Sequence, residues 1–249
     1  NELAPNIQFA TYLNGVGIKG IKDVIVAQPD FFKQLNSDVK AVSLADWKSY
    51  LRWTLISGAA TRLSDDFVNQ NFKFYGNTLV GTPTLKARWK RALEATDGSL
   101  GDALGELFVK KYFTEDSKKR VNEMVDNLVA AYRVRIDSRD WMSPETKKQA
   151  HLKLDKVIRK LGYPDKWKDY STLDIKADAY VSNVFRANTY SFNEMVNRLG
   201  KPIDRKAWMM TAPTINAYYN PTINEIVFPA GIMQPVFFNP EADDAVNYG

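Results

Sequence analysis

The sequence contains no cysteine and only one histidine, and these two scarcities exclude several kinds of chemistry. Without cysteine the chain can form no disulfide, no thiolate nucleophile and no cysteine-ligated zinc. With His151 alone, a metal site that uses two histidine ligands cannot form within these residues, and a Ser-His-Asp triad would have to use the same side chain. His151 lies among lysines in a predicted helix, with no acidic partner or nucleophile indicated nearby. We therefore expect it to be a surface side chain.

Long apolar runs are also missing. No run approaches the ~18 residues that a membrane-spanning helix needs, so we predict no membrane segment in this chain. The first residues, NELAPNIQFATYL, lack a basic stretch followed by an apolar core, and we predict no signal peptide. The chain does not begin with Met, which a processed or trimmed protein would explain.

Charge is nearly balanced, with 34 Lys and Arg against 29 Asp and Glu and a net charge of +5. The basic residues are spread along predicted helices and alternate with acids, a pattern typical of a solvated helix surface. No glycine-rich phosphate loop, RNA-binding signature or zinc knuckle is present. We therefore expect no nucleic-acid partner, and a basic nucleic-acid-binding domain is kept only as a third alternative.

Most of the chain shows helical periodicity. The balance of 45% hydrophobic and 25% charged residues in 249 residues suits one large core or two smaller ones. Ser43 and Asp46 have the spacing of a capping box, and Ser64 precedes two acids at a second helix start. A run from about residue 115 to 136 carries an apolar stripe made of Val121, Met124, Val125, Leu128 and Tyr132. We expect such stripes to be buried core and residues 1–140 to form an all-helical bundle.

Two further helices are predicted before the pattern changes. Ser143-Pro144-Glu145 marks a helix start, and we expect this helix to run to about Leu161 and to end at Gly162. Another helix is expected from about 177 to 199.

From Trp208 the chain favours strands. WMMTAPTINAYYN is rich in β-branched and aromatic residues, Asn220-Pro221 is a turn signal, and INEIVFP alternates as a second strand that stops at Pro229. These features predict a β-hairpin, followed by the rigid apolar loop PAGIMQPVFFNP.

Four C-terminal motifs, NAYYNP, NEIVFPAGIMQP, FF and NYG, resemble the neprilysin and endothelin-converting-enzyme family of zinc metallopeptidases, which includes the bacterial endopeptidase O group. WMSPETKKQA and LGYPD give a weaker match to the family's interdomain helix. The resemblance implies a mainly α fold, with a large helical domain followed by the start of a thermolysin-like α+β catalytic domain that contains the hairpin. The expected boundaries are 1–140 for the helical domain, 141–200 for interdomain helices and 201–249 for the start of the catalytic domain.

The resemblance also implies a metal that these residues do not bind. In the family, the NYG-like element leads into a helix with H-E-x-x-H, whose histidines bind zinc and whose Glu activates water, and a later E-x-x-x-D supplies the third ligand. We therefore expect zinc in the intact enzyme, but no catalytic or metal-ligating residue in this chain, which would end just before that helix. Its partners would be peptide substrates and the remaining C-terminal part of the catalytic domain. The implied location is periplasmic or extracellular.

Five substrate-binding residues follow from the resemblance. Asn216 and Ala217 would pair with the backbone of an extended peptide, Tyr218 would border the non-primed side, and Ile232 and Phe237 would line an apolar S1′ pocket. From the residues alone, Asn216 could instead be a turn or sheet-edge residue, and the two apolar residues could be core. The implied reaction is cleavage of peptides on the amino side of hydrophobic residues, with this chain inactive alone. The alternative is a non-catalytic helical interaction module that retains a relict peptide-binding edge.

Overall fold

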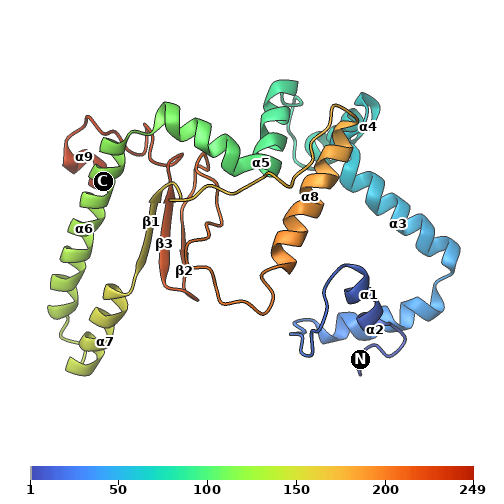
Figure 1. Cartoon of the computed structure of the whole chain (residues 1–249), viewed down its shortest axis with the longest axis horizontal. Coiled ribbons are helices and arrows are strands. Elements are labelled where there is room, and N and C mark those ends of the chain that lie inside the picture. The colour runs from blue at the N-terminus through green and yellow to red at the C-terminus, as the bar shows by residue number, and fades with distance from the viewer. Residues whose placement is uncertain (1) are drawn as a thin grey trace. The chain divides into compact units, whose positions relative to one another are not determined.

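The computed structural model describes residues 2–249, which form two compact units (Figure 1). The first unit comprises the chain up to Arg88 together with Leu173–Pro202, and the second comprises Trp89–Thr172 and Ile203–Gly249. Within the described residues, strands occur only in the second unit, and helices dominate both. The predicted mainly α fold is therefore confirmed. Among residues 2–249, no helix is both long enough and apolar enough to cross a membrane.

The first unit is built entirely from helices. Its α-helices are α1 (Phe9–Gly15), α2 (Pro29–Ala41), α3 (Leu44–Ala59), α4 (Asp65–Asn71) and α8 (Tyr180–Val196), with a 3₁₀ turn at Ala60–Arg62 and a π-helical segment at Phe72–Leu79. The predicted capping box is present, because the backbone N–H of Asp46 donates to Ser43 Oγ at 3.2 Å. Helix α8 forms where a helix was expected, although it is shorter at both ends.

The apolar stripe of α3 is not buried. Tyr50, Leu51 and Leu55 are 59%, 60% and 61% exposed. The expectation that apolar stripes form buried core is therefore wrong for this helix.

The second unit combines helices with a small sheet. Its elements are α5 (Arg88–Tyr112), α6 (Glu115–Asp137), α7 (Pro144–Asp155), β1 (Ile158–Gly162), β2 (Tyr218–Asn220), β3 (Glu225–Pro229) and α9 (Asp244–Tyr248). Ser143 caps α7 as predicted, accepting a hydrogen bond from the backbone N–H of Thr146 at 3.2 Å, with Pro144 at the first helical position. Helix α5 is interrupted at Leu100, whose φ of −131° is not helical.

The helix predicted from residue 143 to Leu161 is wrong in its last six residues. It ends at Asp155, and the next residues form strand β1, which pairs in parallel with β3. Gly162 ends this strand rather than a helix. Its φ of +87° favours glycine, and a Cβ there would lie 2.8 Å from the ring of Phe113.

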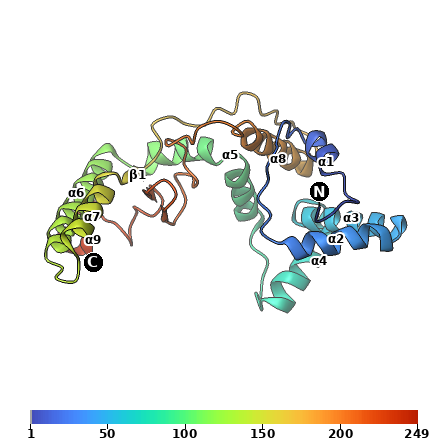
Figure 2. The same cartoon turned by 90° about the horizontal axis from the view of Figure 1, so that it is seen from below.

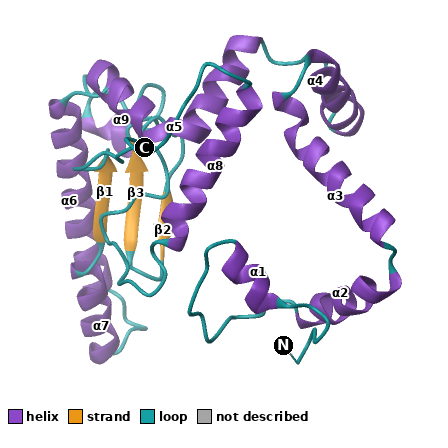
Figure 3. Cartoon of the chain, turned by 45° about the vertical axis from the view of Figure 1, so that its right-hand side comes forward, coloured by secondary structure: helices purple, strands orange, loops and turns teal. Residues whose placement is uncertain are grey.

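The sheet has three strands in the order β1-β3-β2, drawn in orange in Figure 3. Strand β2 is antiparallel to β3, with Tyr218 opposite Val227 and Asn220 opposite Glu225, so the predicted hairpin is confirmed. Its first strand is only three residues long. The segment 208–217, expected to be part of that strand, contains turns and bends instead.

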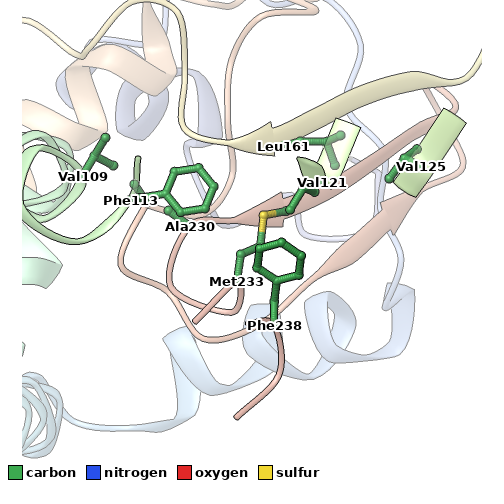
Figure 4. Packing of buried hydrophobic residues seen from close by; sticks show 9 residues of the cluster. Val109, Phe113, Val121, Val125, Leu161, Ala230, Met233 and Phe238 are labelled. Carbon is green, nitrogen blue, oxygen red and sulfur yellow. The ribbon is translucent and has the colours of Figure 1, made fainter. Parts of the chain in front are cut away.

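The core of the second unit is shared between α5, α6 and the C-terminal segment (Figure 4). Its buried members are Val109, Phe113, Val121, Val125, Leu161, Ala212, Ala230, Met233 and Phe238. The predicted stripe of α6 is thus buried at Val121 and Val125, whereas Leu128 and Tyr132 are exposed. Residues up to 140 are mainly helical, as predicted, and α5 and α6 also bury apolar side chains against residues beyond 200.

Candidate functional site

Strand β2 forms one edge of the sheet. It pairs with β3 on one side, and within residues 2–249 no strand pairs with its other side (Figure 1). The outward N–H and C=O groups of such an edge can pair with an extended peptide, which then adds to the sheet as a further strand. The edge is short, since β2 has only three residues.

Two of the five predicted residues lie directly before this edge. Asn216 is exposed, and its Oδ1 accepts a hydrogen bond from the backbone N–H of Ala217 at 2.8 Å. This local bond leaves the side-chain Nδ2 of Asn216 without a hydrogen-bond partner among residues 2–249. A primary amide can donate through this nitrogen to a peptide carbonyl. The small side chain of Ala217 leaves room beside it.

The segment leading to Asn216 is held by the loop that follows β3. The backbone N–H of Gly231 donates to the carbonyl of Ala212 at 2.8 Å. A Cβ on Gly231 would lie 2.2 Å from the carbonyl oxygen of Pro213, so the two backbones touch without space for a side chain. This contact fixes the chain three residues before Asn216.

All five predicted residues lie toward the same end of the sheet. Because β2 and β3 are antiparallel and Tyr218 faces Val227, the residues before Tyr218 run toward Pro229, where the loop with the other two begins. In that loop Ile232 is partly buried and packs against the core, whereas Phe237 is 67% exposed. Packing against the core therefore explains why an apolar side chain is present at Ile232, but it does not explain the exposed side chain of Phe237. The roles of both residues in an S1′ pocket stay predictions.

Tyr218 has inward contacts that the sequence did not indicate. Its hydroxyl donates to Glu225 Oε1 at 3.3 Å and accepts from the backbone N–H of Met209 at 3.2 Å. Burial raises the pKa of this tyrosine above its ordinary value. Glu225 is in turn paired with Lys160 of β1. Neither charged residue was singled out from the sequence, where Lys160 falls in a lysine-rich stretch expected to be helical.

His151 is not the isolated surface residue that was expected. Its Nε2 lies 2.7 Å from Asp137 Oδ1, which joins α7 to the end of α6, and its side chain is only 25% exposed. The prediction that it has no acidic partner is therefore wrong. The carboxylate lies fourteen residues away at the end of the preceding helix, so it could not be recognised as a neighbour from the local sequence.

The residues of this chain do not fit a catalytic zinc site. Catalytic zinc takes three protein ligands drawn from His, Cys, Asp and Glu. Among residues 2–249 no three such side chains come together, and the single histidine is bonded to Asp137.

A cavity of about 300 Å³ lies between α6 and the C-terminal segment, where α9 lies beside α6 (Figures 1 and 2). Its charged lining comes mainly from α6 and includes Asp116, Lys119, Arg120 and Glu123, with Asp244 opposite. Arg120 donates to the carbonyls of Pro240 and Ala242 and pairs with Asp244 at 2.8 Å. The cavity thus contains none of the five predicted residues, and Arg120 serves to hold the C-terminal segment against α6.

Comparison with known proteins gives consistent matches. Residues 1–164 and residues 216–249 match models described as peptidase family M13. Endothelin-converting enzyme 1 of Rattus norvegicus is 32% identical over 259 residues, covering 99% of this chain and 34% of that protein. Neutral endopeptidase of Lactobacillus helveticus is 32% identical over 246 residues, covering 98% of this chain and 38% of that protein.

Solved structures agree. The zinc metalloprotease ZMP1 of Mycobacterium tuberculosis, solved in complex with an inhibitor, superposes with a TM-score of 0.90 at 41% identity. That match covers 99% of this chain and 37% of the other.

These matches place the chain among the peptidases. More narrowly, it belongs to peptidase family M13, and the resemblance to neprilysin and endothelin-converting enzyme is confirmed. The chain spans about a third of the length of the curated relatives it matches.

Proposed function

We propose that this chain is part of a zinc-dependent endopeptidase and supplies its helical, substrate-restricting portion and its substrate-binding edge. The observation that carries the proposal is the free outer edge of β2, preceded by an exposed Asn216 with an unused side-chain donor, in a chain of peptidase family M13. The domain boundaries at residues 140 and 200 and the periplasmic or extracellular location belong to the same proposal.

A substrate would bind as an added strand. Its backbone would pair with the outward N–H and C=O groups at the start of β2, and Asn216 Nδ2 would donate to one of its carbonyls. A hydrophobic substrate side chain would lie toward Ile232 and Phe237, which favours cleavage on the amino side of that residue. When bound in the intact enzyme, zinc would polarise the scissile carbonyl and activate water. Its ligands would come from outside these 249 residues, because the side chains described above do not fit such a site.

The proposal is tested with Asn216→Ala in the longer peptidase. The change removes one or two hydrogen bonds to the substrate backbone, so we expect kcat/KM to fall by about 1 to 3 kcal/mol, roughly ten- to a hundredfold. Zinc content and melting temperature should stay the same, because Asn216 is exposed and its only hydrogen bond among residues 2–249 is local. Asn69→Ala, another exposed asparagine, is the matched control and should leave kcat/KM unchanged.

Two results would contradict the assignment. Unchanged kinetics for Asn216→Ala would make the residue a bystander, and loss of zinc or of folding would make its role structural. The alternative, a non-catalytic interaction module, predicts peptide binding without chelator-sensitive hydrolysis in the longer protein. The 249-residue chain alone is expected to hydrolyse no peptide.

A further inference from the structure

A buried ion pair lies across the sheet, on the face opposite α6. Lys160 of β1 and Glu225 of β3 have side chains that are 5% and 1% exposed, and Lys160 Nζ is 2.5 Å from Glu225 Oε2. The register places Lys160 opposite Val227 and Ile158 opposite Glu225, so the two charged side chains emerge on the same face. Leu161 emerges on the other face and packs in the core with α6.

The pair is part of a larger polar network. Besides the ion pair, Lys160 donates to the carbonyl of Ala207 at 2.5 Å. The other carboxylate oxygen of Glu225 accepts from the hydroxyl of Tyr218 at 3.3 Å, and that hydroxyl accepts from the backbone N–H of Met209 at 3.2 Å. The network therefore connects β1, β3, the edge strand β2 and the covering segment at 207–209.

Stability alone does not explain such a pair. Removing two charges from water costs several kcal/mol per ion, and apolar side chains of similar volume often serve a fold equally well or better. A buried ion pair does, however, impose geometry, because each charged group must keep its partner at one position. Here the ion pair fixes Glu225, and Glu225 in turn fixes the hydroxyl of Tyr218. Without this hydrogen bond, Tyr218 would be held by side-chain packing and by the pairing of a strand of only three residues.

We propose that Glu225, held in place by Lys160, is a positioning residue that fixes the β2 edge for peptide binding through the hydroxyl of Tyr218. The hydrogen bond from Tyr218 sets where the strand begins, and Asn216 and Ala217 directly precede it. This inference deepens the proposed function and rests on it. The substrate is again an extended peptide. The new element is that the carboxylate of Glu225 positions the binding edge without touching the peptide.

The experiment compares two double variants that lose the same charges. Lys160→Met/Glu225→Gln removes the ion pair but keeps an oxygen that can accept from Tyr218, whereas Lys160→Met/Glu225→Met removes that acceptor as well. Arg159→Met, which breaks the more exposed pair with Asp126 on the other face, is the control. Each change is measured in the 249-residue chain by amide hydrogen exchange, and in the longer peptidase by kcat, KM and zinc content.

In the Met double variant Tyr218 loses its hydrogen bond to residue 225. We therefore expect the amides of residues 216–220 to exchange about tenfold faster and kcat/KM to fall about tenfold, mainly through a higher KM. The Gln double variant keeps an acceptor for Tyr218 but loses Lys160, which holds that acceptor in place, so we expect a smaller change of about threefold in both measurements. The Arg159→Met control should match wild type. Amides at 121–125 in α6 and the zinc content should not change in any variant.

Equal exchange at 216–220 in the two double variants would overturn the positioning role, and so would equal kinetics. Should a double variant fail to fold, Glu225→Met and Glu225→Gln are compared as single changes by the same criteria. The proposed function is tested separately, because it fails if the wild-type longer peptidase shows no chelator-sensitive hydrolysis. Exchange at 216–220 still decides the positioning role in that case.

Discussion

At the scale of single residues, Gly231 shows how closely the chain before the candidate site is held. It is the second residue after β3, and its N–H donates to the carbonyl of Ala212. A Cβ at this position would meet the carbonyl oxygens of Pro213 at 2.2 Å and Thr214 at 2.8 Å, distances that real Cβ atoms do not show. Because both obstacles are backbone, no side-chain rotation can relieve them. A residue other than glycine would have to displace the segment that leads to Asn216.

We therefore predict that Gly231→Ala destabilises the second unit by about 1 to 3 kcal/mol, the usual cost of forcing extra volume into a packed site. The measurement is urea-induced unfolding followed by fluorescence. Gly98→Ala is the control: Gly98 lies in α5, nothing lies within 4 Å of the place that an alanine methyl would take, and this change should instead stabilise the protein by about 0.5 to 1 kcal/mol. Equal stability of Gly231→Ala and wild type would show that the Pro213 segment can shift at little cost.

At the scale of elements, the sequence was informative wherever the signal was local. The caps at Ser43 and Ser143 and the turn after Asn220 depend on residues within a few positions of one another, and all were predicted correctly. The resemblance supplied the five candidate site residues, and their placement at one end of the sheet agrees with a common role without testing it.

Strand β1 was missed because its signal is not local. Its residues, IRKLG, continue the lysine-rich helical pattern of α7, and Lys160 looks like a solvated side chain. It becomes a strand by pairing in parallel with β3, and Lys160 can be buried only because Glu225 lies beside it. Both partners are more than sixty residues away in the chain, so periodicity and propensity could not reveal them. The same pairing makes β3 a central strand and not half of an isolated hairpin.

The junction between β1 and α6 gives a prediction on pH. The hydroxyl of Tyr163 donates to the carboxylate of Glu115 in the first turn of α6, and this bond raises the pKa of Tyr163 to about 12. A pKa raised in the folded state means that the tyrosine binds its proton more tightly when folded. Its contribution to stability is complete below its unfolded pKa of about 10 and is lost as pH rises toward about 12.

We expect the difference in unfolding free energy between wild type and Tyr163→Phe to be constant from pH 7 to about 9.5 and to shrink as pH rises above about 10. Urea unfolding of both proteins across this range measures it, and subtraction cancels the titration of the other tyrosines and lysines. Absorbance at about 295 nm, where tyrosinate absorbs, should show one late-titrating tyrosine fewer in the variant. A difference independent of pH would mean that the bond to Glu115 contributes nothing.

At the scale of the whole chain, the two units differ in what they bury. The second unit has a contiguous core that includes large side chains such as Phe113 and Phe238. The buried apolar residues of the first unit are small, namely Ala4, Ala59, Ala60, Val68, Val184 and Ala187. Since burial of apolar area is the main source of folding free energy, the first unit has much less of it to draw on. We therefore expect the two units to differ in local stability.

This difference sets the order in which we expect a protease to cut the chain. If the hairpin of β2 and β3 were isolated, it would be marginal in water, and the region after about Lys201 would be cut first. In the structure β3 lies between β1 and β2, and the loop after it contributes Ala230, Met233 and Phe238 to the core. In the first unit, residues 17–28 contain no helix or strand, and most of their side chains are exposed.

We predict that brief digestion with a protease of broad specificity cuts within residues 17–28 before it cuts within residues 208–229. Cleavage requires several residues of backbone to open, and opening costs least where few apolar contacts are broken. Mass spectrometry of the earliest fragments gives the order, and digestion in about 6 M urea is the control, because unfolded chain should be cut at both segments at similar rates. First cleavage within 208–229 would mean that pairing with β1 adds too little to protect the hairpin. In that event the edge of β2 would be mobile before any peptide binds, and the positioning role of Glu225 would also lose its support.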